Sequence, residues 1–424
     1  MKTPKLASAI EWGLLLILAV MPLHAFFSVV IGHYFGHEAL FQAWKEIALL
    51  VLAGLTGLLL YRDPVRLNRL QNPWILGAGL FVAFGLLITL ITRPPFLIAA
   101  FGIKTDLEFL LAGLIAAMVT SADFLRRTLK VGLIMAAVVS GYDLLQIFIL
   151  PPDFMTHFGY GPSTIAPYQQ IAQGSSALRF PSTLGGPNQL GTYLILPLCV
   201  TAALLIKHRR TWQVALLLSC IISLIWTFSR SAWLGAAAAL LITIVFTVPA
   251  KLRRPAITAA AIVVLCAALV LPALTAKGGQ LQYLILHSSL KNHAQTNLSD
   301  SQHFQSLTNG AAAVISRPFG HGLGTAGPAT FHAGNINIIE NYYLQVGYET
   351  GLAGIGLFVF IVAALTYSVI KRRTQAPLAI PIAASLIGIS MVALVLPAWT
   401  DSSTALIMWI TAGGVAGLPR QGTA

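Results

Sequence analysis

Long apolar runs return along the whole of this 424-residue chain. Each run is about 20 residues long, which is enough for one helix to cross a hydrocarbon core about 30 Å thick. The composition agrees with this interpretation, because 57% of the residues are hydrophobic and only 9% are charged. The sequence therefore predicts an all-α polytopic membrane protein.

We expect about twelve transmembrane helices, which form a single integral membrane domain over residues 1–424. The first run is too long to be the core of a cleaved signal peptide, so we interpret it as an uncleaved span. The expected spans cover residues 9–31, 43–61, 73–92, 105–121, 128–150, 189–206, 212–228, 231–249, 255–275, 341–370, 377–397 and 402–418.

The basic residues are distributed unevenly between the two ends of these spans. With the N-terminus placed in the cytoplasm, the cytoplasmic segments hold 18 Lys and Arg residues and the outer segments hold 8. Such an excess is typical of cytoplasmic loops, so we expect both termini in the cytoplasm. The basic clusters are short and lack interleaved aromatic residues, so the net charge of +13 does not indicate nucleic-acid binding.

Two segments on the expected outer side are long, namely 151–188 and 276–340. Long loops in a compact protein are usually functional. The first is rich in Pro, Gly, Ser and Gln. The second predicts one or two amphipathic helices, over 281–290 and 299–315, followed by a glycine-rich turn over 317–324.

Basic residues on the outer side run against the positive-inside distribution and need another explanation. Arg179 precedes a polar segment that ends at Asn188, and Arg230 follows Ser229 in a short turn between two spans. The rigid fork of arginine matches phosphate oxygens, so Arg179 and Arg230 together suggest a phosphate-bearing lipid headgroup. The alternative is that each arginine extends to the interface or pairs with a carboxylate. The full outer set is Lys45, Arg93, Lys104, Arg179, Arg230, Lys277, Lys291 and Arg317.

A polar segment begins at Glu340, where a long apolar run starts. An ionisable group at or within a bilayer is costly and is therefore usually functional. Glu340 is placed to accept a proton from a hydroxyl group, and a helix N-terminus would stabilise its charge. The alternative is that it only caps the helix. Glu349, nine residues further on, would lie half a turn around a helix and is expected to pair inside the bundle.

Several motifs of metal and nucleotide chemistry do not occur in the sequence. It holds no HExxH, no pair of CxxC motifs, no Walker-type loop and no Asp-x-Asp. The histidines of the second outer loop are not spaced as zinc ligands. His303 is the best candidate among them for a role in binding. We therefore expect neither a metal nor another cofactor.

Three motifs follow one another in a fixed order. Arg179 with Gly185–Asn188 comes first, then Ser229–Trp233, then Pro318–Gly324 followed by Glu340–Gly354. Together they resemble the O-antigen ligase and polymerase superfamily of bacterial envelope glycosyltransferases. The resemblance implies a GT-C-like fold and a metal-independent glycosyl transfer on the outer face of the cytoplasmic (inner) membrane. The implied donor is a glycan on a polyprenyl diphosphate, and the acceptor is a glycan or a lipid.

The resemblance covers residues 175–370 in detail. It implies that Arg179 and Arg230 bind the diphosphate and stabilise it as it leaves, which fixed cations can do. Ligases of the family carry a histidine at the position of Glu340 here, whereas Gly351-Leu352-Ala353-Gly354 follows Asn341 after nine residues, the spacing that the family has. This departure favours the polymerase branch, with Glu340 as the base. An oligosaccharide ligase that transfers a finished glycan to lipid or protein is the alternative.

On this hypothesis the loop 276–340 covers the site, and Asn341, Tyr342 and Tyr343 contact the substrate, with the aromatic rings stacked on sugars. A twelve-span transporter or flippase is the rival from another class. It would show related halves and charges at the middle of the bilayer. The sequence shows no such symmetry, and its polar groups cluster at one face.

Overall fold

The computed structural model describes residues 3–36, 41–171, 177–255, 257–258, 293–332, 334 and 336–419, and of residues 293–303 and 332 only the backbone. The described chain is almost entirely helical. Its one short sheet pairs β1 (Gln169–Gln170) antiparallel with β2 (Leu178–Arg179), with Gln169 opposite Arg179. The prediction of an all-α protein is therefore confirmed.

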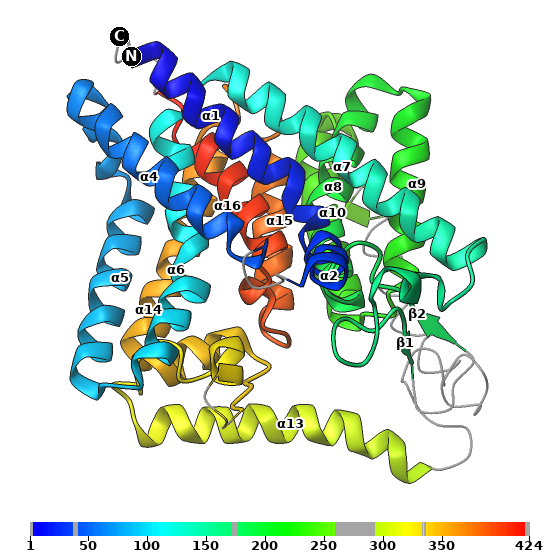
Figure 1. Cartoon of the computed structure of the whole chain (residues 1–424). Helices are drawn as coiled ribbons and strands as arrows, with labels where there is room; N and C mark the ends of the chain where they lie inside the picture. Colours follow the sequence, from blue (N-terminus) through cyan, green and yellow to red (C-terminus); the bar gives the residue numbers. More distant parts are fainter. Residues whose placement is uncertain are drawn as a thin grey trace.

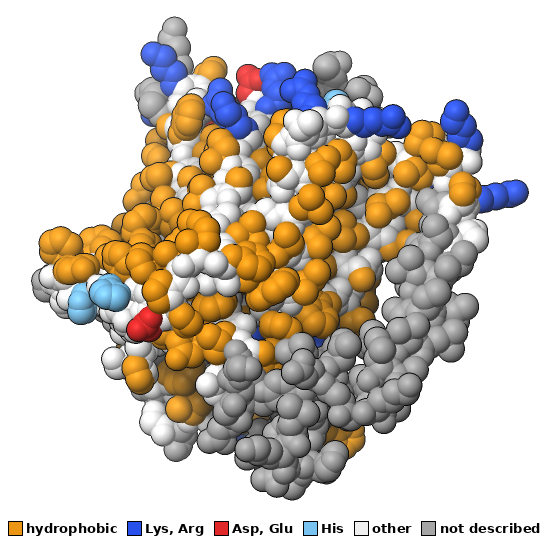
Figure 2. Space-filling model, turned by 90° about the vertical axis from the view of Figure 1, so that its right-hand side faces the viewer, with side chains coloured by type: hydrophobic (Ala, Val, Ile, Leu, Met, Phe, Trp, Pro, Cys, Tyr) orange, Lys and Arg blue, Asp and Glu red, His pale blue; other side chains and the backbone are white. Residues whose placement is uncertain are grey.

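The helices form a bundle with two different ends (Figure 1). Both termini lie at one end, which we call the basic end and define by residues 62–72, 120–130, 207–212 and 371–378. Lys and Arg side chains gather along this edge in Figure 2. The opposite end, called the loop end, holds residues 149–171, 177–186, 316–332, 334, 336–341 and 393–401.

Arginines of the basic end also stabilise the fold through hydrogen bonds. Arg66 Nη1 donates to the carbonyl of Met118 at 2.8 Å, and Arg69 Nη1 donates to that of Ala117 at 2.9 Å. These carbonyls belong to the last turn of a helix, where no intrahelical donor remains, so the arginines satisfy them. The segments of the basic end are thereby held together.

Most helices run from one end of the bundle to the other. They follow the order α1 (Thr3–Val20), α4 (Trp44–Arg62), α5 (Pro73–Thr92), α6 (Phe96–Val119), α7 (Ala122–Phe148), α8 (Pro187–His208), α9 (Thr211–Trp226), α10 (Arg230–Thr247), α14 (Tyr342–Lys371), α15 (Ala379–Val392) and α16 (Ser402–Ala416).

The remaining elements are short or lie near the ends. The helix α13 runs across the loop end, beneath the bundle in Figure 1. These elements are η1 (Met21–Leu23), α2 (His24–Phe35), η2 (Pro64–Gln71), η3 (Phe154–Phe158), α13 (His293–Ser316), η4 (Gly327–His332) and η5 (Ala398–Thr400).

In the described part of the chain, seven helical segments are long and apolar enough to cross a membrane. The helices α9, α15 and α16 are apolar but shorter. This supports a multi-pass membrane protein, and the total of twelve spans stays a prediction. Most of the expected span 255–275, and the expected helix 281–290, fall outside the described residues.

Two expected spans differ from the helices observed. The run 9–31 is not one helix, because α1 ends at Val20 and α2 leaves in another direction (Figure 1). Pro22, in the connecting η1, has no N–H to donate to a continuous helix. The span expected to begin at residue 105 begins at Phe96 instead, and its charged residues lie within the helix.

Large aromatic side chains form the centre of the core, where α5, α6, α14 and α16 meet. Trp409 packs against Phe109, with ring centroids 5.1 Å apart, and against Trp74 at 6.3 Å. Phe109 in turn contacts Phe358 of α14. All four rings are fully buried. This core fixes α6 and α14, which carry several of the polar groups described next.

Candidate active site at the loop end

The side chain of Arg179 joins the first outer loop to the turn between α9 and α10. Its Nε donates to the carbonyl oxygen of Thr227 at 2.5 Å, and its Nη2 donates to Oδ1 of Asn188 at 2.6 Å. Arg230, the first residue of α10, is close enough for its charge to act on Arg179. The structure therefore brings together the two arginines and Asn188, which are far apart in sequence.

The turn that carries Arg230 has an unusual backbone. Phe228 has φ of 48°, a left-handed conformation that is strained for a residue with a side chain. The N–H of Ser229 donates to Oγ1 of Thr227 at 3.2 Å, and the Ser229 and Ser231 hydroxyls lie 3.4 Å apart. Ser229 is buried and precedes α10, so its hydroxyl lies within the same polar cluster.

Close helix packing holds this turn against α8. A Cβ on Gly191 would lie 2.7 Å from the Cβ of Ala232 and 3.3 Å from Oγ1 of Thr227. Only glycine allows this approach, because real Cβ atoms do not come so near. Gly191 lies one turn beyond Asn188, so the contact fixes Asn188 relative to Arg230.

Arg179 is a buried cation, with only 9% of its surface exposed. Burial, and then the positive charge of Arg230, lower the pKa of Arg179 to about 10, so it stays charged at neutral pH. Among the described residues, Arg179 takes part in no ion pair. A charge buried without a counter-ion is costly, which makes this position receptive to an anion.

The N-terminus of α14 forms a second polar group at the loop end. Glu340 is partly buried and directly precedes Asn341, which caps the helix. Oδ1 of Asn341 accepts from the N–H of Leu344 at 2.9 Å, and its Nδ2 donates to the carbonyl of Leu394 at 2.7 Å. The N-cap residue of α14 is therefore Asn341.

The two tyrosines that follow have different surroundings. Tyr342 is fully buried, and its ring packs edge-on against Phe358 at 5.1 Å. It therefore offers no free face for a sugar in this structure. Tyr343 keeps part of its surface accessible, and its hydroxyl donates to the carbonyl of Ser390 at 3.1 Å. Of the two tyrosines, only Tyr343 is available for the expected stacking.

The glycine-rich turn over 317–324 is inserted between α5, α6 and α14. The N–H groups of Gly324 and Ala326 donate to Oε1 of Glu349 at 3.1 and 3.2 Å. The carboxyl group of Asp106, from α6, contacts that of Glu349 on its other side. The expectation that Glu349 pairs inside the bundle is therefore met, although its partners are backbone amides and a second carboxyl group.

Backbone contacts leave no room for side chains within this insertion. A Cβ on Gly102 of α6 would lie 2.2 Å from the nitrogen of Gly324, and one on Gly351 of α14 would lie 2.1 Å from the carbonyl oxygen of Pro318. Gly351 has φ of 71° and kinks α14 beside Glu349. The turn is thus a packed structural element that positions the N-terminal part of α14.

We expect Gly102→Ala to destabilise the protein, because the added methyl group meets backbone atoms that cannot move aside. Overpacking of this kind costs roughly 1–3 kcal/mol. Gly79→Ala on α5 is a matched control, since a Cβ there meets nothing within 4 Å. Thermal unfolding of the purified variants measures the difference. An equal unfolding temperature for both variants would show that the turn is not packed as described.

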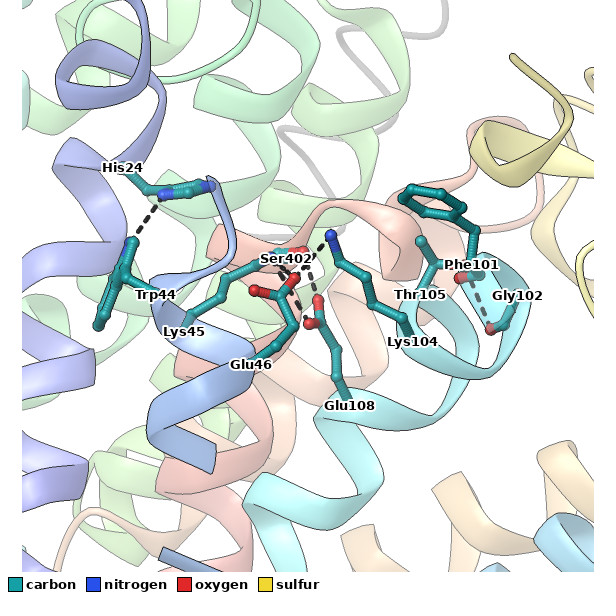
Figure 3. A network of polar contacts seen from close by, with 10 residues as sticks. All are labelled: His24, Trp44, Lys45, Glu46, Phe101, Gly102, Lys104, Thr105, Glu108 and Ser402. Carbon is teal, nitrogen blue, oxygen red and sulfur yellow. Dashed lines mark hydrogen bonds and ion pairs between the residues drawn. The ribbon is translucent and has the colours of Figure 1, made fainter. Parts of the chain in front are cut away.

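A buried charge network lies among α4, α6 and α16 (Figure 3). Lys45 contacts Glu46 and lies 3.7 Å from Oε2 of Glu108, while Lys104 donates to Glu46 at 2.7 Å. The hydroxyl of Ser402 donates to Glu108. Lys45 and Glu108 are more than nine-tenths buried, so these charges compensate one another inside the protein.

The spacing on α6 sends its charges to two different faces. Lys104 and Glu108 are four residues apart and share one face, which meets α4 and α16 (Figure 3). Asp106, two residues from each, lies on the opposite face against Glu349. Sequence reasoning missed this network, although Lys45 and Lys104 belong to the same outer basic set as Arg179 and Arg230.

Two hydrogen bonds connect the break between α1 and α2 to its neighbours, one from the loop that carries Arg179 and one from the N-terminus of α16. Oγ1 of Thr183 donates to the carbonyl of Pro22 at 2.7 Å. Oγ of Ser403, next to Ser402, donates to the carbonyl of Met21 at 2.9 Å. The break between α1 and α2 therefore lies between the arginine cluster and the N-terminus of α16.

Residues 393–401 connect the N-terminus of α14 to the N-terminus of α16. The N–H of Tyr342 donates to the carbonyl of Ala393 at 3.0 Å, beside the bond from Asn341 to Leu394. From there the chain continues through η5 to Asp401, which caps α16 by accepting from Thr404 at 3.0 Å. The side chain of His303 lies outside the described residues, so its expected role stays a prediction.

Residues 214–359 match the sequence profile of a family described as O-antigen ligase. This O-antigen ligase domain supports the O-antigen ligase and polymerase superfamily. The match begins in α9 and ends in α14, so it includes Arg230, the glycine-rich turn and Glu340. Arg179 and Asn188 precede it and enter the site through the contacts described above. No curated protein matches the chain.

The match over residues 214–359 supports glycan transfer of the ligase or polymerase type by a membrane protein. The family also implies a glycan and a lipid-linked substrate. These statements agree with the polar cluster at the loop end, where the buried Arg179 lies beside Arg230 and Asn188.

Proposed function

We propose that this protein transfers glycan from a polyprenyl diphosphate to an acceptor hydroxyl, and that it polymerises a polysaccharide. The site lies at the loop end, on the outer face of the cytoplasmic membrane, with both termini in the cytoplasm. The segment 276–340 covers it, on a GT-C-like fold. The family match supports the reaction type, and the arginine cluster supports the chemistry of the donor.

The observation that carries the proposal is the burial of Arg179 beside Arg230. Two guanidinium groups repel each other, so an anion between them is stabilised by both. Arginine presents five donors, and the bonds to Thr227 and Asn188 occupy only two from Arg179. A diphosphate carries the charge and the acceptor oxygens that this arrangement favours.

An apolar cavity of about 410 Å³ supports a lipid-linked donor. It lies between α1, α7, α8, α15 and α16, and its lining includes Pro22, Met135, Tyr193 and Ile407. Pro22 is hydrogen-bonded to Thr183, four residues beyond Arg179. The cavity also extends to the basic end, where Arg126 and residues 375–378 line it, so Pro22 is the part of its wall that connects to the loop of Arg179.

The proposed step forms one bond and breaks one. The acceptor oxygen bonds to the anomeric carbon of the donor sugar, while the bond from that carbon to the diphosphate oxygen breaks. The hydroxyl proton passes to the carboxylate of Glu340. Polyprenyl diphosphate leaves with the electron pair, and Arg179 and Arg230 stabilise the negative charge that develops on it.

The product distribution separates polymerase from ligase. Full-length protein in liposomes is supplied with a polyprenyl-diphosphate-linked repeat unit, and the products are resolved by size. A polymerase gives a ladder of lengths, and a ligase gives a single transfer to an added lipid or protein acceptor. Uptake of glycan into liposomes without any glycan product would instead show a transporter or flippase.

We expect Glu340→Gln to lower kcat about 10²- to 10⁴-fold with little change in KM, because it removes the proton acceptor and leaves donor binding intact. The measurement is initial transfer rate against donor concentration. Asp153→Asn, an exposed residue of the first outer loop, is the matched control and should keep full activity. A Glu340→Gln variant with unchanged kcat would remove Glu340 from the mechanism.

A further inference from the structure

A groove of about 740 Å³ lies between α7 and the α8–α9 pair, at the basic end of the bundle. It is separate from the arginine cluster at the loop end. Nearer the loop end, α7 and α9 are joined directly, because the Ser219 hydroxyl donates to that of Ser140 at 2.8 Å. Towards the basic end the two helices leave the groove between them.

One face of α7 changes from cationic to apolar along the groove. Arg126 and Lys130 are four residues apart and line its basic end, and Ile134 and Ala137 continue the same face. From Lys130 to Ala137 this face extends about 10 Å along the helix axis. Its charged residues therefore lie where the headgroup of a phospholipid would be, and its apolar residues lie where the acyl chains would be.

The opposite wall has the same order. Arg210 and His208 line the groove at the basic end, and Trp212 follows with 44% of its surface exposed. Tryptophan at this depth is typical of the membrane interface. Below it, Ala215 and Leu216 complete an apolar floor.

The charges in the groove are available to a ligand. Arg126 pairs with Asp123, but within the described residues neither Lys130 nor Arg210 takes part in an ion pair. Among the residues that the structure describes, no acidic side chain lines the groove. Basic pockets between membrane helices on this side of a membrane bind anionic lipid headgroups.

We propose that this groove binds one anionic phospholipid from the leaflet at the basic end. The phosphate contacts Lys130 and Arg210, and an acyl chain lies on Ile134, Ala137 and Leu216. The lipid fills the space between α7 and α9 and joins them where their direct contacts stop. This site is separate from the arginine cluster, and its lining shares Arg126, Leu129 and Leu133 with the apolar cavity proposed for the donor chain.

The test is native mass spectrometry of the full-length protein in neutral detergent, titrated with phosphatidylglycerol, phosphatidylcholine or inorganic phosphate. We expect phosphatidylglycerol to be retained and to raise the unfolding temperature. The variant Lys130→Gln/Arg210→Gln should bind it roughly 30-fold more weakly, from the loss of two charges near the surface. Ala137→Phe, which fills the floor and keeps the charges, should also lose it.

The matched control is Arg253→Gln/Arg254→Gln. These arginines follow α10, are exposed and do not line the groove. This variant makes the same change in net charge and should bind phosphatidylglycerol as the unchanged protein does. Equal retention of phosphatidylcholine, equal stabilisation by inorganic phosphate, or equal loss in the control variant would each overturn the proposal.

Discussion

Replacing Arg179 with glutamine is expected to lower glycan transfer by about 10²- to 10³-fold, and Arg230→Gln by a similar factor. Each variant removes a fixed cation from the position where the diphosphate becomes charged, and a single preorganised donor contributes that much in other enzymes. The measurement is the transfer rate in liposomes with the lipid-linked donor. Because both arginines act on the same leaving group, the double variant should lose less than the product of the two single losses.

Two further variants separate this role from general effects of charge. Arg179→Lys keeps the charge but not the planar fork, and we expect it to restore only part of the activity. Arg317→Gln removes an exposed arginine of the loop end and should keep full activity. If Arg179→Gln and Arg230→Gln both extended chains at the normal rate, the proposed diphosphate site would be wrong.

Replacing Lys45 with methionine is expected to destabilise the protein by about 3 kcal/mol or more. The change leaves the carboxylate of Glu108 buried with the hydrogen bond from Ser402 and the more distant charge of Lys104. Breaking a buried ion pair from one side costs this much because the other charge loses its compensation. Glu46 also loses its contact with Lys45 but keeps the one with Lys104, so the larger loss falls on Glu108.

The second substitution Glu108→Gln tests that explanation. In the double variant Lys45→Met/Glu108→Gln no isolated charge remains, and the amide oxygen still accepts from Ser402. We expect most of the lost stability to return, since removing both partners of a buried pair is often nearly neutral. Thermal unfolding of the three proteins measures this. A double variant as unstable as Lys45→Met would mean that packing, and not charge, explains the loss.

The arginine cluster shows how far an electrostatic rule can go without a structure. Arg179 and Arg230 were candidates because outer basic residues contradict the positive-inside distribution. The structure places them close enough to interact, and Asn188 bonds to Arg179. The same rule also marked Lys45 and Lys104, but it did not indicate that their partners were Glu46 and Glu108.

The first span shows where local pattern is misleading. Hydrophobicity is continuous over 9–31, yet the α-helix is interrupted at η1, and α2 departs from the axis of α1. The carbonyl oxygens of Pro22 and Met21 at this break accept hydrogen bonds from the hydroxyls of Thr183 and Ser403. These donors lie 161 and 382 positions further along the chain. Pro22 is visible in the local sequence, but these distant donors are not, and they stabilise the break.

The sequence by itself determined the membrane class, the approximate helix positions and the candidate cations, because apolar length and charge asymmetry are properties of consecutive residues. Only the tertiary structure decided which charges are compensated. Glu108 meets Ser402, 294 residues away, and Glu349 meets the amides of an inserted glycine turn. The physical reason is that the cost of a buried charge depends on its neighbours in space, and helix packing alone brings these neighbours together.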